Sequence, residues 1–264
     1  MATLRDYRVH RRAIARSRLV IWTVILLAFG WATWGTGFGV LTFVQGIGGS
    51  FAFIATDLLP PRLEAAPQFI DDAIDTLLMS YVGMVMSVVL SLPLGVLGAR
   101  NTTVHRLLSY ASKGTVSFIR AAPDLIFAIF LVALFGIGPL AGTVAMGISG
   151  IGILGKAYAD GIEAIDMQQV EGIRAAGGTW FQVLGQGVWP QFKPTFITWS
   201  LYRLDLNIRE AAVLGLVGAG GLGYALITEI RTFQYRTATT VILMIFVMIL
   251  LVEFVTGILR RRVL

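Results

Sequence analysis

The stretch VEGIRAAGGTWFQVLGQGVWPQFKP, residues 170–194, is the longest run in the middle of the chain that could not lie in a lipid core. Apolar spans flank it on both sides. Residues 174–176 favour a helix, and Gly177 and Gly178 readily take the left-handed conformation that ends one. Thr179 can cap a second short helix. The pattern predicts a helix–glycine–helix knuckle that is held at a membrane surface and shaped to press into a partner.

The spacing within this knuckle resembles the EAA loop of ABC-importer permeases, in which Glu is followed six residues later by Gly and thirteen beyond that by Pro. Glu171, Gly177 and Pro190 hold those positions, whereas Gly172 and Ile173 replace the two alanines that usually follow the Glu. In that family the loop docks into a groove of a cytoplasmic ATPase. The alternative is an ordinary loop between two membrane helices. The resemblance assigns ATPase coupling to Glu171, Arg174, Ala175, Gly177, Gly178 and Pro190.

The composition is that of an integral membrane protein. Of the 264 residues, 56% are hydrophobic and 14% are charged, compared with about 25% charged residues in soluble domains. The net charge of +6 does not indicate nucleic-acid binding, because the basic residues gather beside apolar spans, as the positive-inside rule describes. Cysteine is absent, and neither His10 nor His105 has a metal-ligand neighbour pattern. We therefore expect no metal site and no nucleic-acid partner.

Six apolar segments are long enough to cross a bilayer at ~1.5 Å per helical residue. They are residues 19–40, 73–99, 115–135, 140–158, 192–217 and 237–259. Arginines lie beside the first, second and sixth segments, which predicts that both termini are cytoplasmic. Residues 47–72 are of mixed character, and they fit either a helix in the outer membrane interface or a loose linker.

Two glycine patterns resemble nucleotide-binding motifs but lack the required context. Gly218, Gly220 and Gly223 satisfy GxGxxG, but a dinucleotide site needs that motif between a strand and a helix. Here the motif follows a membrane helix. A near P-loop that ends at Lys156 has Ala157 where the magnesium-binding Ser or Thr is required. We therefore expect no nucleotide or other cofactor in this chain.

The fifth segment is unusually polar, with Arg203, Asp205, Asn207, Arg209 and Glu210. A charge that faces lipid costs several kcal/mol, so these side chains are predicted to face the interior of the bundle. Helical spacing places Arg203, Asn207 and Glu210 on one face. Asp205 and Arg209 have the favourable order for an i,i+4 ion pair. Two hypotheses stay open: the network holds the helix or a dimer together, or an arginine lends positive potential to the path of an anionic substrate.

Several separated blocks resemble the permease subunit of phosphonate ABC importers. They comprise residues 76–101, 118–130, 136–166 and 207–223, the last of which is NIREAAVLGLVGAGGLG. The resemblance covers residues 73–264 as a permease core and leaves residues 1–72 as a cytoplasmic tail, a first transmembrane helix and an outer interfacial segment. Phosphite, hypophosphite and methionine permeases share much of the glycine-rich block. Its outer glycines are Gly218, Gly220, Gly221 and Gly223.

The resemblance implies an all-α, multi-pass protein of the bacterial inner membrane with the type I importer fold. It also implies a transport subunit rather than an enzyme. The implied partners are a second copy of the chain, two cytoplasmic ATPases that bind ATP and Mg, an extracytoplasmic phosphonate-type binding protein and membrane lipid. The alternatives are a permease for another small substrate, a secondary transporter or a membrane-embedded enzyme. No inverted repeat is obvious in the sequence, which disfavours the secondary transporter.

Overall fold

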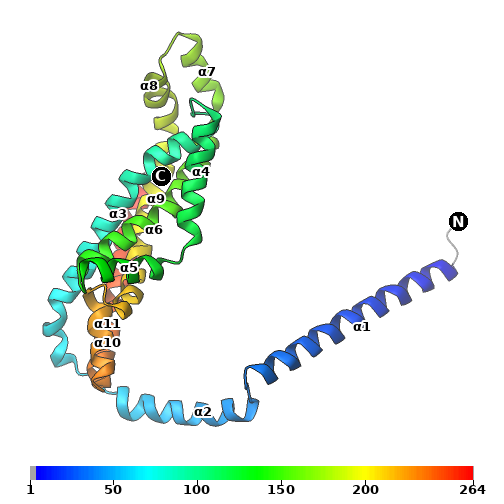
Figure 1. Cartoon of the computed structure of the whole chain (residues 1–264), viewed down its shortest axis with the longest axis vertical. Coiled ribbons are helices and arrows are strands. Elements are labelled where there is room, and N and C mark those ends of the chain that lie inside the picture. The colour runs from blue at the N-terminus through cyan, green and yellow to red at the C-terminus, as the bar shows by residue number, and fades with distance from the viewer. Residues whose placement is uncertain (1–3, 264) are drawn as a thin grey trace. The chain divides into compact units, whose positions relative to one another are not determined.

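The computed structural model describes the backbone of residues 4–263 and the side chains of residues 17–39 and 41–261, and every regular element in that part of the chain is helical (Figure 1). The prediction of an all-α fold is therefore confirmed. The chain divides into two compact units, Met1–Asp57 and Leu58–Leu264. The permease core predicted to begin at residue 73 lies within the second unit, and that boundary stays a prediction.

The first unit contains α1 (Leu4–Gly35), α2 (Val40–Phe53) and most of the π-helical segment η1 (Ile54–Leu58), which ends one residue into the second unit. The first predicted span, residues 19–40, ends early, because the chain turns after Gly35, with Gly37 at a φ of +66°. Residues 47–58 are helical, so the loose linker proposed for residues 47–72 is wrong over that part. The predicted basic tail falls largely on residues 1–16, whose side chains lie outside the described part of the chain.

The second unit is a bundle built around three long helices. In chain order its elements are η2 (Leu63–Phe69), α3 (Ile70–Gly98), α4 (Arg106–Ala121), α5 (Asp124–Phe135), α6 (Pro139–Glu163), α7 (Met167–Ala175), α8 (Trp180–Gln182), η3 (Val183–Val188), α9 (Trp189–Leu214), η4 (Gly215–Val217), α10 (Gly221–Arg231) and α11 (Tyr235–Val263). Helices α3, α6 and α9 pack against one another, and α11 packs on α9 and α10. Figure 1 places α7 and α8 at one end of this bundle, the loop end, and α10 at the opposite end, the glycine end.

Helix α6 is the centre of this unit because its small residues let its neighbours approach closely. Leu154 and Tyr158 are fully buried in it. A Cβ added to Gly95 of α3 would lie 2.7 Å from the Tyr158 Cβ, and one added to Gly83 would lie 3.0 Å from the Met146 Cβ. Close packing through small residues is one of the forces that associate helices in a membrane, where lipid is as apolar as the side chains. The glycines of α3 and α6 therefore hold the two helices together.

The third predicted span, residues 115–135, is not one helix. It consists of α4 and α5, whose axes meet at a bend of 83°. Pro123 explains the break, since proline has no N–H to donate and disfavours the helical conformation of the residue before it. Ala122 is accordingly extended, with a ψ of 129°. The prediction of a continuous span was wrong at this point, and the bend brings the start of α5 towards α9.

Five helices of the described residues are long and apolar enough to cross a membrane, or up to seven if each bent pair counts as one span. The bent pairs are α4 with α5, and the segment Trp180–Val217 with α10. Apart from the break between α4 and α5, the second, fourth, fifth and sixth predicted spans correspond to α3, α6, α9 and α11. The additional candidate is Leu41–Leu58, which overlaps the segment that the sequence assigned to the outer interface. The predicted number of six lies within the observed range.

Candidate functional site

Residues 170–194 form the predicted knuckle at the loop end, and apolar side chains anchor it to the bundle. Val170, Val183 and Val188 are each at most 3% exposed. They belong to one buried cluster with Tyr158 of α6 and Phe192 of α9. Burial of such side chains stabilises the packed arrangement by about 1.5–3 kcal/mol each. The knuckle is therefore continuous with the core of the bundle.

The turn in the knuckle has the local geometry that the sequence predicted. Gly177 has a φ of +82°, which residues with a Cβ rarely adopt. Thr179 caps α8 in a capping box, in which its side chain accepts from the Gln182 N–H and the Gln182 side chain accepts from the Thr179 N–H. The prediction that glycine ends the first helix and Thr179 starts the second is confirmed.

Polar contacts also attach the knuckle to the loop between α3 and α4. Arg174 donates to the carbonyl oxygen of Asn101 at 3.1 Å. The Trp180 Nε1 donates to the carbonyl oxygen of Thr102 at 2.8 Å. The exposed Glu171, by contrast, has no hydrogen bond or ion pair to any residue that the structure describes. A movement of α7 and α8 would thus be transmitted to the end of α3 through Arg174 and Trp180.

The remaining predicted coupling residues shape the backbone rather than make side-chain contacts. Ala175 is the last residue of α7, and Pro190 lies in the first turn of α9. A Cβ on Gly178 would lie 2.8 Å from the Ile173 carbonyl oxygen, so the turn leaves no room there. Phe181, in contrast, is 78% exposed beside Trp180. An exposed aromatic ring on a well-anchored knuckle is suited to fill a pocket of a partner.

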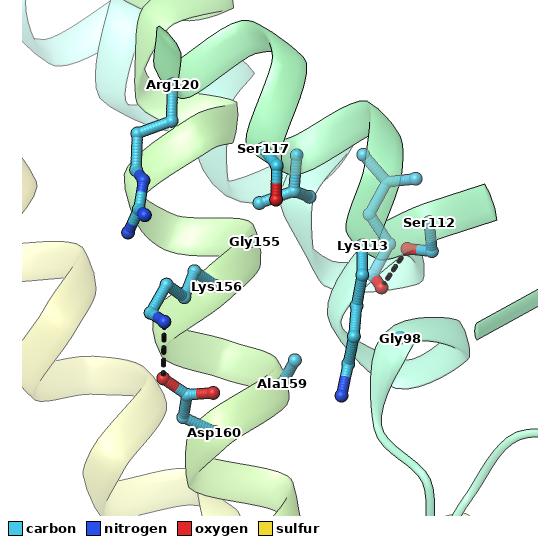
Figure 2. Close-up of a pocket in the computed structure, with 11 residues that line it drawn as sticks. Gly98, Ser112, Lys113, Ser117, Arg120, Gly155, Lys156, Ala159 and Asp160 are labelled. Carbon is cyan, nitrogen blue, oxygen red and sulfur yellow. Dashed lines mark hydrogen bonds and ion pairs between the residues drawn. The ribbon is translucent and has the colours of Figure 1, made fainter. Parts of the chain in front are cut away.

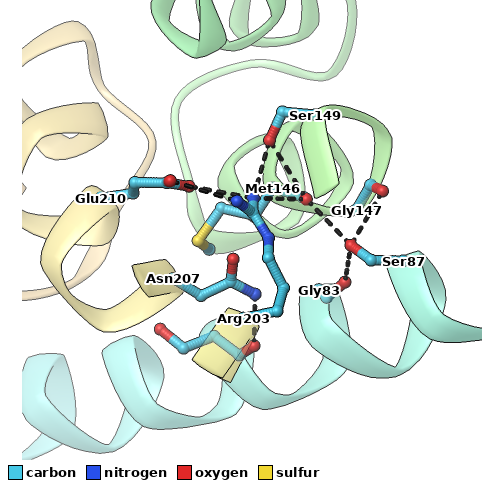
Figure 3. A network of polar contacts seen from close by, with 9 residues as sticks. Gly83, Ser87, Met146, Gly147, Ser149, Arg203, Asn207 and Glu210 are labelled. Carbon is cyan, nitrogen blue, oxygen red and sulfur yellow. Dashed lines mark hydrogen bonds and ion pairs between the residues drawn. The ribbon is translucent and has the colours of Figure 1, made fainter. Parts of the chain in front are cut away.

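The polar network of α9 lies inside the bundle, and Arg203 is its centre (Figure 3). The Arg203 side chain is completely buried. Its guanidinium forms a bidentate pair with Glu210, with N–O distances of 3.2 and 3.0 Å. It also donates to the Met146 carbonyl oxygen at 3.0 Å and to the Ser149 hydroxyl at 2.8 Å. Arg203 therefore joins α9 to the middle of α6.

Gly150 makes room for this guanidinium. A Cβ at position 150 would lie 2.7 Å from the Arg203 Nε and would collide with the Ser87 hydroxyl. Ser87 in turn donates within α3 and towards α6, with the Gly83 carbonyl oxygen at 2.8 Å and the Gly147 carbonyl oxygen at 3.0 Å. The three helices α3, α6 and α9 thus meet at one buried polar centre.

The other polar residues of α9 divide between two faces. Asn207 is fully buried and donates to the Ser80 carbonyl oxygen of α3 at 2.8 Å. Asp205 and Arg209 form the predicted ion pair at 2.9 Å, and Arg209 also lies 3.4 Å from Glu253 of α11. The Arg209 side chain is 48% exposed. Arg203 and Arg209 therefore have different environments, one sealed inside the subunit and one at its surface.

Sequence reasoning missed the partners that come from other helices. Ser149, Asp124 and Glu253 contribute to the network, and Asp124 at the start of α5 interacts with Glu210. The sequence signal that could have identified such partners is a polar residue within an apolar span, because a polar side chain there has a high free-energy cost unless it has a polar partner. Asp124 and Glu253 carried that signal, but a single hydroxyl such as Ser149 did not.

The glycine-rich segment forms the tight link between α9 and α10 at the glycine end. Gly218, Gly220 and Gly221 all have positive φ values, of +92°, +84° and +64°. Gly223 packs against the carbonyl oxygens of α9, and a Cβ there would lie 2.8 Å from the Ala211 oxygen. Thr76 of α3 accepts from the Leu222 N–H at 2.9 Å. The segment lies between helices, and no strand precedes it within the described residues.

Comparison with known proteins identifies the family. Residues 91–264 match the model of the binding-protein-dependent transport system inner membrane component. The chain is 37% identical over 244 residues to the phosphite transport system permease protein PtxC of Stutzerimonas stutzeri, covering 92% of this chain and 87% of that protein. It is 38% identical over 210 residues to the phosphate-import permease protein PhnE of Mycolicibacterium smegmatis, covering 79% of this chain. The matched part is 40% of that relative's length.

The fold is also that of a solved importer. The structure described as inward facing conformations of the MetNI methionine ABC transporter matches with a TM-score of 0.65 and 23% identity, over 74% of this chain and 96% of that one. At this identity the likeness concerns the fold alone. The family match covers most of the bundle that holds the knuckle and the polar network. The chain belongs to the binding-protein-dependent transport system inner membrane components, as a multi-pass inner-membrane permease subunit of an ABC importer that is similar to the permeases of phosphite and phosphate transport systems.

Proposed function

We propose that two copies of this chain form the translocation pathway of an ATP-driven importer for a phosphorus oxyanion, such as a phosphonate or phosphite. Residues 170–194 couple that pathway to two cytoplasmic ATPase subunits, which hold ATP and Mg. An extracytoplasmic binding protein delivers the substrate. ATP must bind one arrangement of the ATPases better than another in order to shift the pathway between its two orientations.

The observation that carries this proposal is the construction of the knuckle. Its inner side is buried in the core through Val170, Val183 and Val188, and its outer side presents the exposed ring of Phe181. A partner that binds this knuckle and moves can displace it, and the displacement reaches the end of α3 through Arg174 and the rest of α9 through its first turn. The names of the relatives, which concern phosphite and phosphate import, support an oxyanion as substrate.

The test is transport by the reconstituted complex. The permease is co-purified with its ATPase, placed in proteoliposomes and supplied with the binding protein, and the uptake of labelled phosphite, methylphosphonate and methionine is measured. We expect uptake of a phosphorus oxyanion that requires ATP. Uptake driven by an ion gradient without ATP would indicate a secondary transporter, and a preference for methionine would contradict the substrate class.

The topology is a further expectation. The arginines beside the first, second and sixth predicted spans favour a topology of six crossings with both termini and residues 170–194 in the cytoplasm. Tags at either terminus should be protected from external protease in intact cells, and a cleavable site inserted beside Phe181 should be protected as well. Cleavage of a tag at only one terminus would require an odd number of crossings, and the segment Leu41–Leu58 would then be a spanning helix.

Replacing Gly177 with valine should uncouple ATP hydrolysis from transport. Gly177 has open space around it, so the cost arises from the positive φ alone, about 1–2 kcal/mol for a β-branched residue. We expect the Gly177→Val complex to lose uptake per ATP hydrolysed, or to lose the ATPase during purification. Gly177→Asn is the matched control, because asparagine tolerates this conformation better. Equal coupling in the valine and asparagine complexes would remove the special role of this position.

A further inference from the structure

Helix α4 carries three cations on one face, each seven residues from the next. They are Arg106, Lys113 and Arg120. Seven residues make about two helical turns, so the side chains lie above one another at steps of ~10 Å along the helix. Ser117 and Tyr110 lie on the same face between them. Because the charges follow the helix repeat, they form a row rather than a scattered basic surface.

Two cavities open along this row, and Lys113 lines both. The first has a volume of about 360 Å³ and is bounded by Arg100, Arg106 and Lys113 at the loop end. The second has a volume of about 170 Å³ and lies between α4 and α6. Figure 2 shows Lys113, Ser117 and Arg120 projecting from α4, and Lys156 and Asp160 from α6, around the second cavity.

The packing of α4 on α6 holds this second cavity in shape. Gly155 of α6 contacts Val116, and a Cβ there would lie 2.7 Å from a Val116 methyl group. Gly152 lies against the Arg120 backbone, where a Cβ would come within 2.9 Å of the Arg120 Cα. The close backbone packing of α4 on α6 therefore holds Arg120 and Lys156 at fixed positions around the second cavity.

The cations outnumber the acids that face them. Lys113 pairs with Glu163 at 2.7 Å, and Lys156 lies 3.8 Å from Asp160. Within the described part of the chain, the side chains of Arg100, Arg106 and Arg120 form no ion pair. Five cations thus face two carboxylates. Arg120 and Lys156 lie within the predicted third and fourth spans, and charges inside membrane spans mark ion or substrate paths.

We propose that the basic track, defined as Arg106, Lys113, Arg120 and Lys156, binds the phosphorus oxyanion as it leaves the permease on the cytoplasmic side. This inference rests on the proposed function and its topology. Partly exposed cations at ~10 Å steps provide several weak sites rather than one tight site, and conduction requires binding that is weak enough for release. The completely buried Arg203, in contrast, has its partners within the subunit and does not belong to this track.

The binding experiment uses the permease–ATPase complex in nanodiscs of phosphatidylcholine, with methylphosphonate as the probe and phosphorus NMR as the readout. Loss of one charge-assisted contact weakens binding by about tenfold, so Arg120→Gln and Lys156→Gln should each have that effect. Asp160→Asn should change binding in the opposite direction, because it frees Lys156. The exposed Arg18 of α1 lies outside both cavities, and Arg18→Gln should bind like the parent.

Parent-like binding by both Arg120→Gln and Lys156→Gln would overturn the proposal, as would an equal loss in Arg18→Gln. The phosphate group of an anionic lipid has the same chemistry as the cargo, so the measurement is repeated with phosphatidylglycerol in the nanodiscs. If the parent binds no methylphosphonate in phosphatidylcholine but retains phosphatidylglycerol through purification, and the two variants release it, the track is a lipid site and not a cargo site.

Uptake by the same proteins separates this inference from the proposed function. A parent complex that imports no phosphorus oxyanion contradicts the proposed function itself. A parent that imports one, together with Arg120→Gln and Lys156→Gln variants that import it equally fast and bind it equally well, contradicts only the track. Thermal unfolding of each variant confirms that both substitutions, which lie at exposed positions, leave the bundle folded.

Discussion

Replacing Arg203 with glutamine is expected to cost the permease about 3–5 kcal/mol of folding free energy, the range found when one partner of a buried ion pair is removed. The completely buried guanidinium makes four hydrogen bonds, to Glu210, Met146 and Ser149. Without it, Glu210 would face Asp124 with no cation beside them. The measurement is thermal unfolding of the purified subunit, combined with assembly, ATPase activity and uptake of the complex.

Two controls make this result specific. The Arg203→Gln, Glu210→Gln double variant should regain part of the lost stability, because it leaves no unpaired carboxylate at the centre. Arg209→Gln should cost at most about 1 kcal/mol, since its pairs with Asp205 and Glu253 are partly exposed. If Arg203→Gln unfolds and assembles like the parent but loses oxyanion uptake, the arginine acts in the pathway and the structural hypothesis is wrong.

Replacing Gly223 with alanine is expected to disrupt the link between α9 and α10. The added methyl group would lie 2.8 Å from the Ala211 carbonyl oxygen and would collide with the Ala212 carbonyl oxygen. Backbone atoms cannot rotate out of the way as a side chain can, so α10 must shift as a whole. Overpacking of this kind costs about 1–3 kcal/mol and occasionally more. We expect a lower unfolding temperature and a loss of uptake by the complex.

Gly257→Ala in α11 is the matched control for this substitution. Gly257 is also helical, and an added Cβ there would meet no atom within 4 Å. Alanine favours the helix over glycine by about 1 kcal/mol, so this variant should be at least as stable as the parent. If the Gly223→Ala and Gly257→Ala proteins had the same unfolding temperature, α10 would be able to shift without loss of folding stability, and the expected disruption would be wrong.

The features that the sequence predicted correctly depend on residues close together in the chain. The turn at Gly177, the cap at Thr179 and the ion pair between Asp205 and Arg209 involve separations of no more than four residues. The geometry of the local backbone, as a helix, a turn or a cap, brings such residues together. The pairing of Arg203 with Glu210 follows from the same repeat, two turns along one helix. These parts of the knuckle and of the polar network could therefore be predicted before any packing was known.

What the sequence could not supply is the arrangement between helices. Arg203 contacts Met146 and Ser149, which lie more than fifty positions away in the sequence. These contacts form because α9 is rotated about its own axis so that Arg203 faces α6. That rotation depends on where glycine permits close approach, as at Gly150, and this is a property of the whole bundle rather than of any segment. The basic track arises in the same way. The seven-residue spacing of the three cations on α4 is visible in the sequence, but the cavity that they share with Lys156 forms only when α4 packs against α6. The physical reason is that contacts between helices depend on how their side-chain surfaces fit together, which the repeat along one helix does not determine.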